Sequence, residues 1–273
     1  MLDIAGKVAP SVLAVIEELI DQCVLGSASV CETSLSTNSD ALNELHAQKW
    51  GDCLLPRLYF ANVQTGGRGR QGNQWVSQND ALTFSLVIAQ DSINEPTARL
   101  LSLAVGVATA RAIEFVYAPV KCRLKWPNDV YMAGGKVAGI LIETSQAFTD
   151  RIVIGVGVNV DESPTLESPD PTALPQSLFA ATGRRVSRHE VLEAIIRELI
   201  AACEELWESP QSILHQFRER CMLTGKQISF LESGCENQGL CRGIADDGSL
   251  MIQTAAGLRY CDSGAIRLVR LRG

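Results

Sequence analysis

Gln64-Thr-Gly-Gly-Arg68-Gly-Arg70-Gln-Gly72-Asn-Gln-Trp75 is the stretch of this chain that says most about its fold and chemistry. The glycines allow positive φ and a close approach of the backbone to a ligand. The arginines supply planar, permanently charged donors that can bond two oxygens of a carboxylate or phosphate. Trp75 adds a flat ring that can cover a ligand. The stretch therefore predicts an anion-holding loop, with a basic surface turn as the alternative.

The composition favours a folded, non-membrane protein. A chain of 273 residues with 46% hydrophobic content can build one large domain, or a medium domain with a small one. It has no apolar run of the roughly 18 residues that suggest a membrane span, and its start, MLDIAGKVAPSV, lacks the features of a secretory signal. The formal net charge of −7 argues against sequence-independent binding to nucleic acid. We expect a cytoplasmic protein.

The cysteines and histidines do not predict a metal centre. The chain has nine cysteines, and none forms a C-x-x-C pair. The three histidines, His46, His189 and His215, lie far apart in the sequence. We expect reduced thiols that pack as small hydrophobic side chains.

Hydrophobic periodicity predicts a three-part organisation. Residues 1–26 are expected to form an N-terminal helical segment, because apolar residues recur there at helical spacing. Residues 27–221 contain mixed helix and strand patterns and are expected to form the main domain. Residues 222–273 contain five short strand-like pieces separated by turn signals, which predict a small barrel.

Two sequence patches carry neutral polar groups. Ser36-Thr37-Asn38 contains good helix-capping residues, and the same groups could bond a small polar ring. Gly155-Val-Gly157-Val-Asn159 lies in an apolar strand whose glycines imply that something approaches the backbone, for example a flat ligand. Asn159 is either a polar group on that surface or a cap at the strand end.

Two further patches carry charge. Lys125-Trp-Pro-Asn-Asp129 predicts a rigid turn at a strand end, where Asp129 could hold magnesium or simply satisfy the backbone. Lys136 stands at the mouth of an apolar strand, as a solvated or a functional lysine. The chain has no Ser-His-Asp or Cys-His arrangement and no phosphate-binding P-loop motif. Arginines, a lysine and glycine backbone favour electrostatic stabilisation of phosphate charge, which fits nucleotidyl transfer onto a carboxylate.

These patches, with Gly135-Lys-Val-Ala-Gly-Ile-Leu-Ile-Glu143, follow one another in the order found in biotin–protein ligases, and the chain resembles that family most strongly over residues 30–160. Towards the end, Gly225-Lys226 and Gly264-Ala-Ile-Arg-Leu resemble its SH3-like C-terminal domain. The resemblance implies an α+β fold: a mixed, largely antiparallel sheet with flanking helices, like that of class II aminoacyl-tRNA synthetases, plus a small SH3-like β-barrel. It also implies that biotin is activated by ATP as biotinyl-5′-AMP and transferred to a lysine of a biotin carboxyl carrier protein.

The same resemblance implies roles for particular residues. The catalytic residues would be Lys136, Arg68 and Arg70. The biotin-binding residues would be Ser36, Thr37, Asn38, Gln64, Arg68, Gly69, Arg70, Lys136 and Gly139. The nucleotide-binding residues would be Gly67, Arg68, Arg70, Trp75, Asn128, Lys136 and Asn159. Magnesium ligands would be Asp129 and Asn159.

Some features depart from the family pattern. Asn73 stands where many relatives carry a basic residue, Leu35 where an acidic one is frequent, and Val269 near where some relatives carry arginine. We expect no N-terminal DNA-binding domain and no operator binding. A homodimer through exposed sheet edges is also expected as an option.

Two other functions compete with this interpretation. A lipoate–protein ligase would share fold and reaction type, although the loop between Gly66 and Trp75 favours biotin. A non-catalytic regulator could keep the fold, but Arg68, Arg70 and Lys136 are all retained here.

Overall fold

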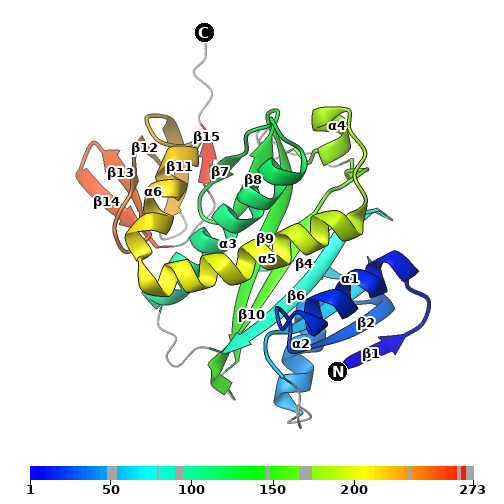
Figure 1. Ribbon diagram of the computed structural model, residues 1–273. Helices are drawn as coiled ribbons and strands as arrows, with labels where there is room; N and C mark the ends of the chain where they lie inside the picture. The colour runs from blue at the N-terminus through cyan, green and yellow to red at the C-terminus, as the bar shows by residue number, and fades with distance from the viewer. Residues whose placement is uncertain are drawn as a thin grey trace.

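The computed structural model describes residues 1–47, 54–78, 80–89, 95–145, 148–165, 174–232, 235–262 and 266–268. Within these ranges a mixed eight-stranded sheet forms the centre of the molecule (Figure 1). Its first three strands are mutually parallel and the remaining neighbours pair antiparallel. In spatial order the strands are β1 (Leu2–Ala5), β2 (Ser27–Ser34), β3 (Arg57–Gln64), β6 (Leu82–Ala89), β10 (Phe148–Val158), β9 (Gly135–Ser145), β8 (Asp129–Met132) and β7 (Arg123–Lys125).

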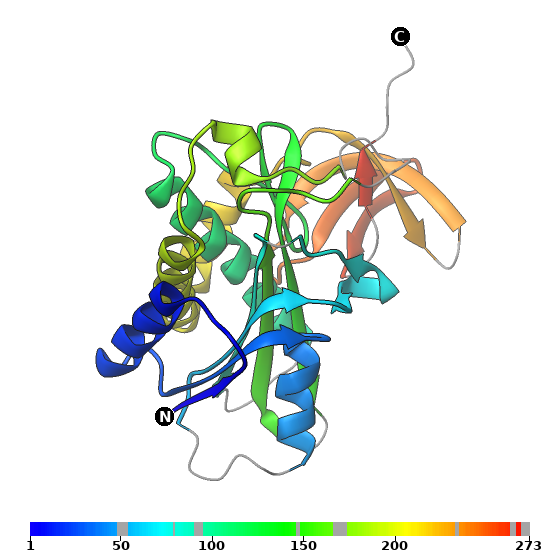
Figure 2. The same ribbon diagram turned by 90° about the vertical axis from the view of Figure 1, so that its right-hand side faces the viewer.

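Helices cover the two faces of this sheet unequally. One face carries α1 (Pro10–Asp21), α3 (Glu95–Val116) and α5 (Arg188–Glu208), while α2 (Thr37–His46) lies on the other (Figure 2). Small residues of α3, including the fully buried Ala104 and Ala108, allow close packing against α5. Two further helices are α4 (Leu178–Thr182) and α6 (Pro210–Arg220). The α2 face carries the cavity described below.

The N-terminal segment is not one helix, so that expectation was wrong in detail. Residues 2–5 form β1, which pairs in parallel with β2 as an edge strand of the main sheet. Gly6, with φ +80°, separates this strand from α1, which begins at Pro10. The buried guanidinium of Arg57 anchors the strand through an ion pair of 3.0 Å to Asp3.

The hairpin after β7 was only partly expected. The sequence predicts a turn at Lys125–Asp129 and a strand that starts at Lys136, and the short strand β8 lies between them. Lys125 pairs with Asp129 across the turn, so the Trp-Pro-Asn segment is the bend of a hairpin. A second turn at residues 133–134 then leads into β9, and the two turns place Asp129 and Lys136 on neighbouring strands.

The C-terminal region forms a separate antiparallel sheet of five strands within the described residues. The five short strands expected in residues 222–273 are present among the described residues. Val269, Arg270 and Gly264 lie outside the described residues, and likeness to an SH3 barrel stays a prediction. In spatial order the strands are β14 (Gly257–Cys261), β13 (Leu250–Thr254), β12 (Cys235–Ile244), β11 (Gln227–Glu232) and β15 (Ile266–Leu268).

Polar contacts join this second sheet to the region of the main sheet. The indole Nε1 of Trp126, inside the hairpin turn, donates to the carbonyl of Gly248 at 2.9 Å. Arg99 of α3 forms ion pairs with Asp262 and, at 4.0 Å, with Asp247. Arg218 of α6 pairs with Asp246 at 2.8 Å. These contacts set the C-terminal sheet beside the turn that carries Asn128 and Asp129.

Candidate active site

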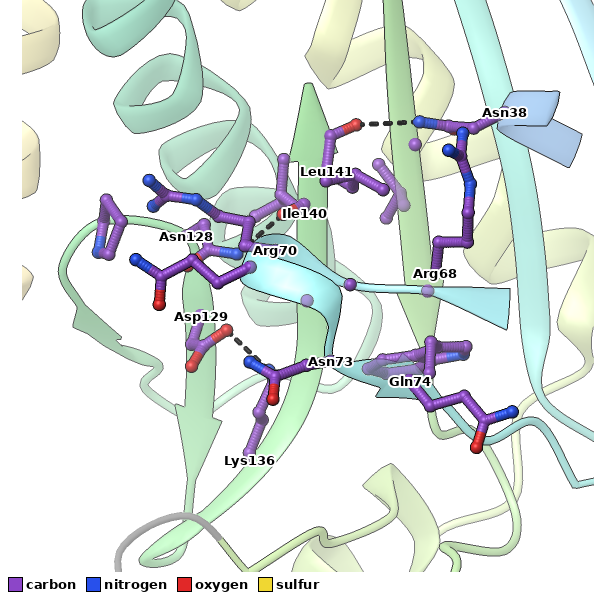
Figure 3. A pocket seen from close by; sticks show the side chains of 18 of the residues that line it. Asn38, Arg68, Arg70, Asn73, Gln74, Asn128, Asp129, Lys136, Ile140 and Leu141 are labelled. Atoms are coloured by element: carbon purple, nitrogen blue, oxygen red, sulfur yellow. Dashed lines mark hydrogen bonds and ion pairs between the residues drawn. The ribbon is translucent and has the colours of Figure 1, made fainter. Parts of the chain in front are cut away.

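One cavity of about 410 Å³ gathers most of the residues singled out in the sequence. It lies on the α2 face of the main sheet, between the start of α2, the glycine–arginine loop and the β7–β8 turn (Figure 3). Gly67 and Asn159 do not line it. The predicted residues that do are Ser36, Thr37, Asn38, Gln64, Arg68, Gly69, Arg70, Trp75, Asn128, Asp129, Lys136 and Gly139.

Glycines on two neighbouring strands form the base of the cavity. Gly155 of β10 lies opposite Leu141 of β9, and Gly157 lies opposite Gly139. A Cβ at Gly155 would come within 2.2 Å of the Asn38 Oδ1, and one at Gly157 within 2.4 Å of the Trp75 indole. The close approach expected from these glycines is therefore present, and the groups that make it are the protein's own side chains.

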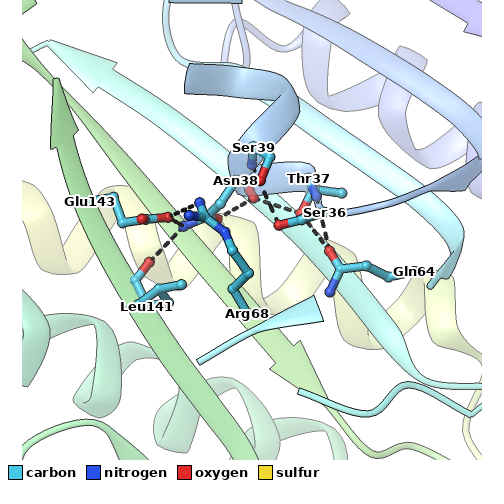
Figure 4. Close-up of polar contacts among 9 residues, drawn as sticks. Ser36, Thr37, Asn38, Ser39, Gln64, Arg68, Leu141 and Glu143 are labelled. Carbon is cyan, nitrogen blue, oxygen red and sulfur yellow. Dashed lines mark hydrogen bonds and ion pairs between the residues drawn. The ribbon is translucent and has the colours of Figure 1, made fainter. Parts of the chain in front are cut away.

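The hydrogen-bonding end of the cavity consists of Ser36, Thr37, Asn38 and Gln64 (Figure 4). Ser36 is the N-cap of α2, and its hydroxyl accepts from the backbone N–H of Ser39 at 3.5 Å. The backbone N–H of Thr37 donates to Gln64 Oε1 at 2.9 Å. The capping and the site interpretations of this segment are thus compatible.

Asn38 is the most constrained member of this end. Its side chain is 4% exposed, as expected of a polar group enclosed by partners. Its Nδ2 donates to Glu143 Oε2 at 2.8 Å and to the Leu141 carbonyl at 3.2 Å. Its Oδ1 accepts from the Ser85 hydroxyl at 2.5 Å. The orientation of this amide is consequently fixed from both sides.

The glycine–arginine loop is a short hairpin over the sheet. Strand β4 (Gly67–Arg68) pairs with β5 (Gln74–Trp75), and the 3₁₀ turn η1 (Arg70–Gly72) joins them. Gly67 is needed for this pairing, because a Cβ there would lie 2.4 Å from the Trp75 carbonyl oxygen. The hairpin positions the Trp75 ring on the sheet and sends its two arginines in different directions.

Arg68 and Arg70 border the same cavity but lie at opposite ends of it. The Arg68 side chain extends toward Asn38, and its Nη2 lies 2.6 Å from Glu143 Oε2 (Figures 3 and 4). The Arg70 side chain lies beside Asn128 instead. The two cations therefore face different partners in the same hollow.

The charged end of the cavity consists of Arg70, Asp129 and Lys136. The Lys136 Nζ lies 2.6 Å from Asp129 Oδ1 and 5.8 Å from the centre of the Trp75 ring. Burial lowers the pKa of the Arg70 guanidinium, and the nearby Asp129 carboxylate opposes that shift. Arginine stays protonated even so. This end therefore brings Arg70 and Lys136 close to the Asp129 carboxylate, and the buried Lys125 lines the same cavity.

Asn128 and Asn159 hydrogen-bond to the backbone next to the charged end. Asn128 Nδ2 donates to the Ile140 carbonyl at 2.7 Å, which ties the turn to β9. Asn159 is 2% exposed, and its Nδ2 donates to the Gln176 carbonyl at 3.2 Å. Its Oδ1 is buried without a hydrogen-bond partner. A direct contact of Asn159 with nucleotide or metal stays a prediction.

Among the described residues that line the cavity, Asp129 is the carboxylate that could bind magnesium. In the part of the chain that is described, no group of three or more His, Cys, Asp or Glu side chains is placed to hold a metal ion. Magnesium is commonly held by one or two carboxylates together with substrate phosphates. A single carboxylate at the charged end therefore fits an ion that arrives with phosphate.

The C-terminal sheet also contributes to the site. Ile266 of β15 lines the cavity, and no pattern in the sequence predicted this. Glu143 and Ser85 were missed as well; both hydrogen-bond to Asn38, and Glu143 also pairs with Arg68. Glu143 was detectable, because alternation along β9 puts residues 139, 141 and 143 on one face of the strand.

Comparison with known proteins supports a particular enzyme family. Residues 33–159 match the Biotin/lipoate A/B protein ligase family. A biotin–[acetyl-CoA-carboxylase] ligase of Mycobacterium tuberculosis is 32% identical over 221 residues, covering 80% of this chain and 79% of that protein. The chain belongs to the biotin–protein ligase family. The family identified from the sequence motifs is thereby confirmed.

Further biotin–protein ligases show the same likeness. The biotin–[acetyl-CoA-carboxylase] ligase of Paracoccus denitrificans is 30% identical, over 81% of this chain and 92% of that protein. The structure of the biotin protein ligase from Aquifex aeolicus in complex with biotin and ATP matches with a TM-score of 0.73 and 25% identity. It covers 89% of this chain and 99% of that one. The expected α+β class is confirmed, and among the described residues no helix is long and apolar enough to span a membrane.

Proposed function

We propose that this protein activates biotin with ATP and transfers it to a lysine of a biotin carboxyl carrier protein. The observation that carries the proposal is the single cavity with a hydrogen-bonding end and a charged end. Membership of the biotin–protein ligase family supports the reaction. The relatives named as ligases of acetyl-CoA carboxylase support this class of carrier. A cytoplasmic location suits such a partner.

In the first step, a carboxylate oxygen of biotin attacks the α-phosphorus of ATP, and the bond from that phosphorus to the bridging oxygen breaks. Biotinyl-5′-AMP and pyrophosphate result. Both reactants are anions, so cations placed where they meet lower the barrier directly. Lys136 and Arg70 are the cations at the charged end and would bridge the carboxylate and the α-phosphate. Magnesium held by Asp129 together with phosphate oxygens would supply further neutralisation.

The biotin ring would occupy the hydrogen-bonding end. A ureido ring offers one carbonyl acceptor and two N–H donors, and Ser36, Thr37, Asn38 and Gln64 supply matching neutral groups. Gly139 leaves space at the base of the cavity next to the Lys136 side chain. Arg68 lies at this end beside Asn38, which suits a role in orienting the substrate.

The nucleotide would extend over the hairpin side of the cavity. Trp75 can cover the intermediate, and the backbone of Gly67 and Gly69 lets the hairpin lie close to it. Exclusion of water matters because the mixed anhydride would otherwise hydrolyse. In the second step, the carrier lysine amine attacks the biotinyl carbonyl carbon, the bond to the phosphate oxygen breaks, AMP leaves and the amine loses a proton.

The test is mass spectrometry of a carrier domain after incubation with this protein, MgATP and either biotin or lipoate. The proposal predicts the mass increase of one biotinyl group, located on one lysine. Modification by lipoate in preference to biotin would assign the protein to the lipoate branch. No modification and no pyrophosphate release with either acid would favour the regulator.

A further inference from the structure

We propose that Glu143 is a positioning residue that sets the biotin affinity of this enzyme by orienting Asn38 and Arg68. This inference rests on the proposed function and adds a residue that the sequence motifs did not assign to the site. Glu143 does not line the cavity itself. It acts one step away, through two side chains that do.

The strand register places Glu143 beside the hydrogen-bonding end. On β9, Leu141 lies opposite Gly155, and Glu143 lies opposite Val153, one pleat further out. On the other side of β10, Gly155 lies opposite Ser85 of β6. Asn38 sits over Gly155, so its amide meets Ser85 on one side and the β9 strand on the other.

A single carboxylate oxygen then serves both donors. Glu143 Oε2 accepts from Asn38 Nδ2 at 2.8 Å and from Arg68 Nη2 at 2.6 Å (Figure 4). An ionised carboxylate only accepts, so it holds the Nδ2 of Asn38 toward β9 and the Oδ1 toward Ser85. It also neutralises Arg68 at an end that would otherwise offer a net positive charge to a neutral ring.

Of the two groups that Glu143 holds, Asn38 is buried and Arg68 is partly exposed. The Glu143 side chain is 23% exposed, while the Arg68 side chain is 42% exposed. Loss of the carboxylate would leave Asn38 free to rotate its amide and Arg68 free to leave the cavity wall. Both changes weaken the site for a ring recognised by fixed donors and acceptors, and neither touches Lys136 or Arg70.

The chain offers a close control in Glu114. Its Oε2 pairs with Arg220 at 3.0 Å, and its Oε1 accepts from the backbone N–H of Cys122 at 2.9 Å. Like Glu143 it is a partly buried carboxylate shared between an arginine and a neutral donor. It lies outside the cavity, so Glu114→Gln reports the effect of losing such a carboxylate on folding alone.

The experiment measures KM for biotin, KM for ATP and kcat by biotin-dependent pyrophosphate release, together with the biotin Kd by calorimetry without ATP. We expect Glu143→Ala to raise both KM and Kd for biotin at least tenfold, with KM for ATP within twofold of the parent. The biotin KM and Kd of Glu143→Gln should fall between those of Glu143→Ala and the parent. The glutamine amide oxygen can still accept from Asn38, but it carries no charge for Arg68. Glu114→Gln should leave all constants near the parent values.

A double variant separates positioning from direct contact. If Glu143 acts through Asn38, Glu143→Gln combined with Asn38→Ala should raise the biotin KM by less than the product of the two single effects. Unchanged biotin constants in Glu143→Gln, with an active parent, would overturn the inference and leave the proposed function standing. A parent that neither binds biotin nor releases pyrophosphate would instead overturn the proposed function.

Discussion

The two ends of the cavity differ in how their polar groups are satisfied. At the hydrogen-bonding end, Asn38 and Thr37 have internal partners, and the charge of Arg68 is matched by Glu143. At the charged end, Arg70 and Lys136 share one carboxylate, that of Asp129, and burial of the Arg70 guanidinium lowers its pKa.

This difference corresponds to two kinds of recognition. A preorganised set of neutral groups suits a ligand that keeps its charge state throughout the reaction. An excess of partly desolvated positive charge suits a place where anions meet and negative charge is redistributed. Substitutions at the two ends should therefore have separable effects on binding and on chemistry.

The largest effect is expected at Lys136. Lys136→Ala removes a cation from the meeting point of the two anions and should lower the rate of adenylation about 10²–10³-fold. The measurement is single-turnover formation of biotinyl-5′-AMP, with biotin Kd determined in parallel. Lys121→Ala is the control, because that side chain is 82% exposed. If Lys136→Ala formed biotinyl-5′-AMP at nearly the parental rate, the charged end would have no special role in the chemical step.

Arg70→Gly should affect retention of the intermediate more than its formation. The guanidinium is a charge-assisted donor for the adenylate phosphate, so its loss should speed release of biotinyl-5′-AMP about 10- to 100-fold. Filter binding of labelled adenylate gives the dissociation rate. If Arg70→Gly released biotinyl-5′-AMP as slowly as the parent, Arg70 would not be needed to retain the intermediate.

Gly157→Ala tests the base of the cavity between the ends. The added Cβ would lie 2.4 Å from the Trp75 ring and should displace it, raising KM for ATP about tenfold through a loss of roughly 1–1.5 kcal/mol of stacking. Gly106→Ala provides the comparison, since its Cβ would meet Leu124 at an ordinary 3.7 Å. If Gly157→Ala and Gly106→Ala had the same KM for ATP, the Trp75 ring would have no role in binding the nucleotide.

The smallest effect is expected where the C-terminal sheet meets the site. Trp126→Phe removes the Nε1 donor to Gly248 and shortens a buried indole to a single ring, so the lost hydrogen bond and the cavity together should cost about 2–3 kcal/mol of stability. Thermal unfolding measures this loss, and biotin Kd should stay within twofold of the parent. A large rise in biotin Kd would mean that the C-terminal sheet controls the hydrogen-bonding end.

Most of the residues singled out in the sequence lie in one cavity, whereas the connections around them were predicted less well, and the roles of these residues stay predictions. The loop glycines, the Ser36 cap and the Lys125–Asp129 turn carry local signals, because capping and turn chemistry depend on neighbouring residues. The β1 strand was missed because four residues carry too little periodicity, and its pairing depends on β2, distant in sequence. The pairs Lys136–Asp129 and Glu143–Asn38 follow from strand register, which no local pattern specifies.

The central claim is that one end of the cavity binds the ring of biotin and the other joins its carboxylate to ATP. Exchange of labelled pyrophosphate into ATP tests this most directly when biotin is compared with biotin amide, which has the ring but no carboxylate. We expect exchange with biotin, none with the amide, and competitive inhibition of exchange by the amide. Absence of biotin-dependent exchange, or failure of the amide to compete, would contradict it.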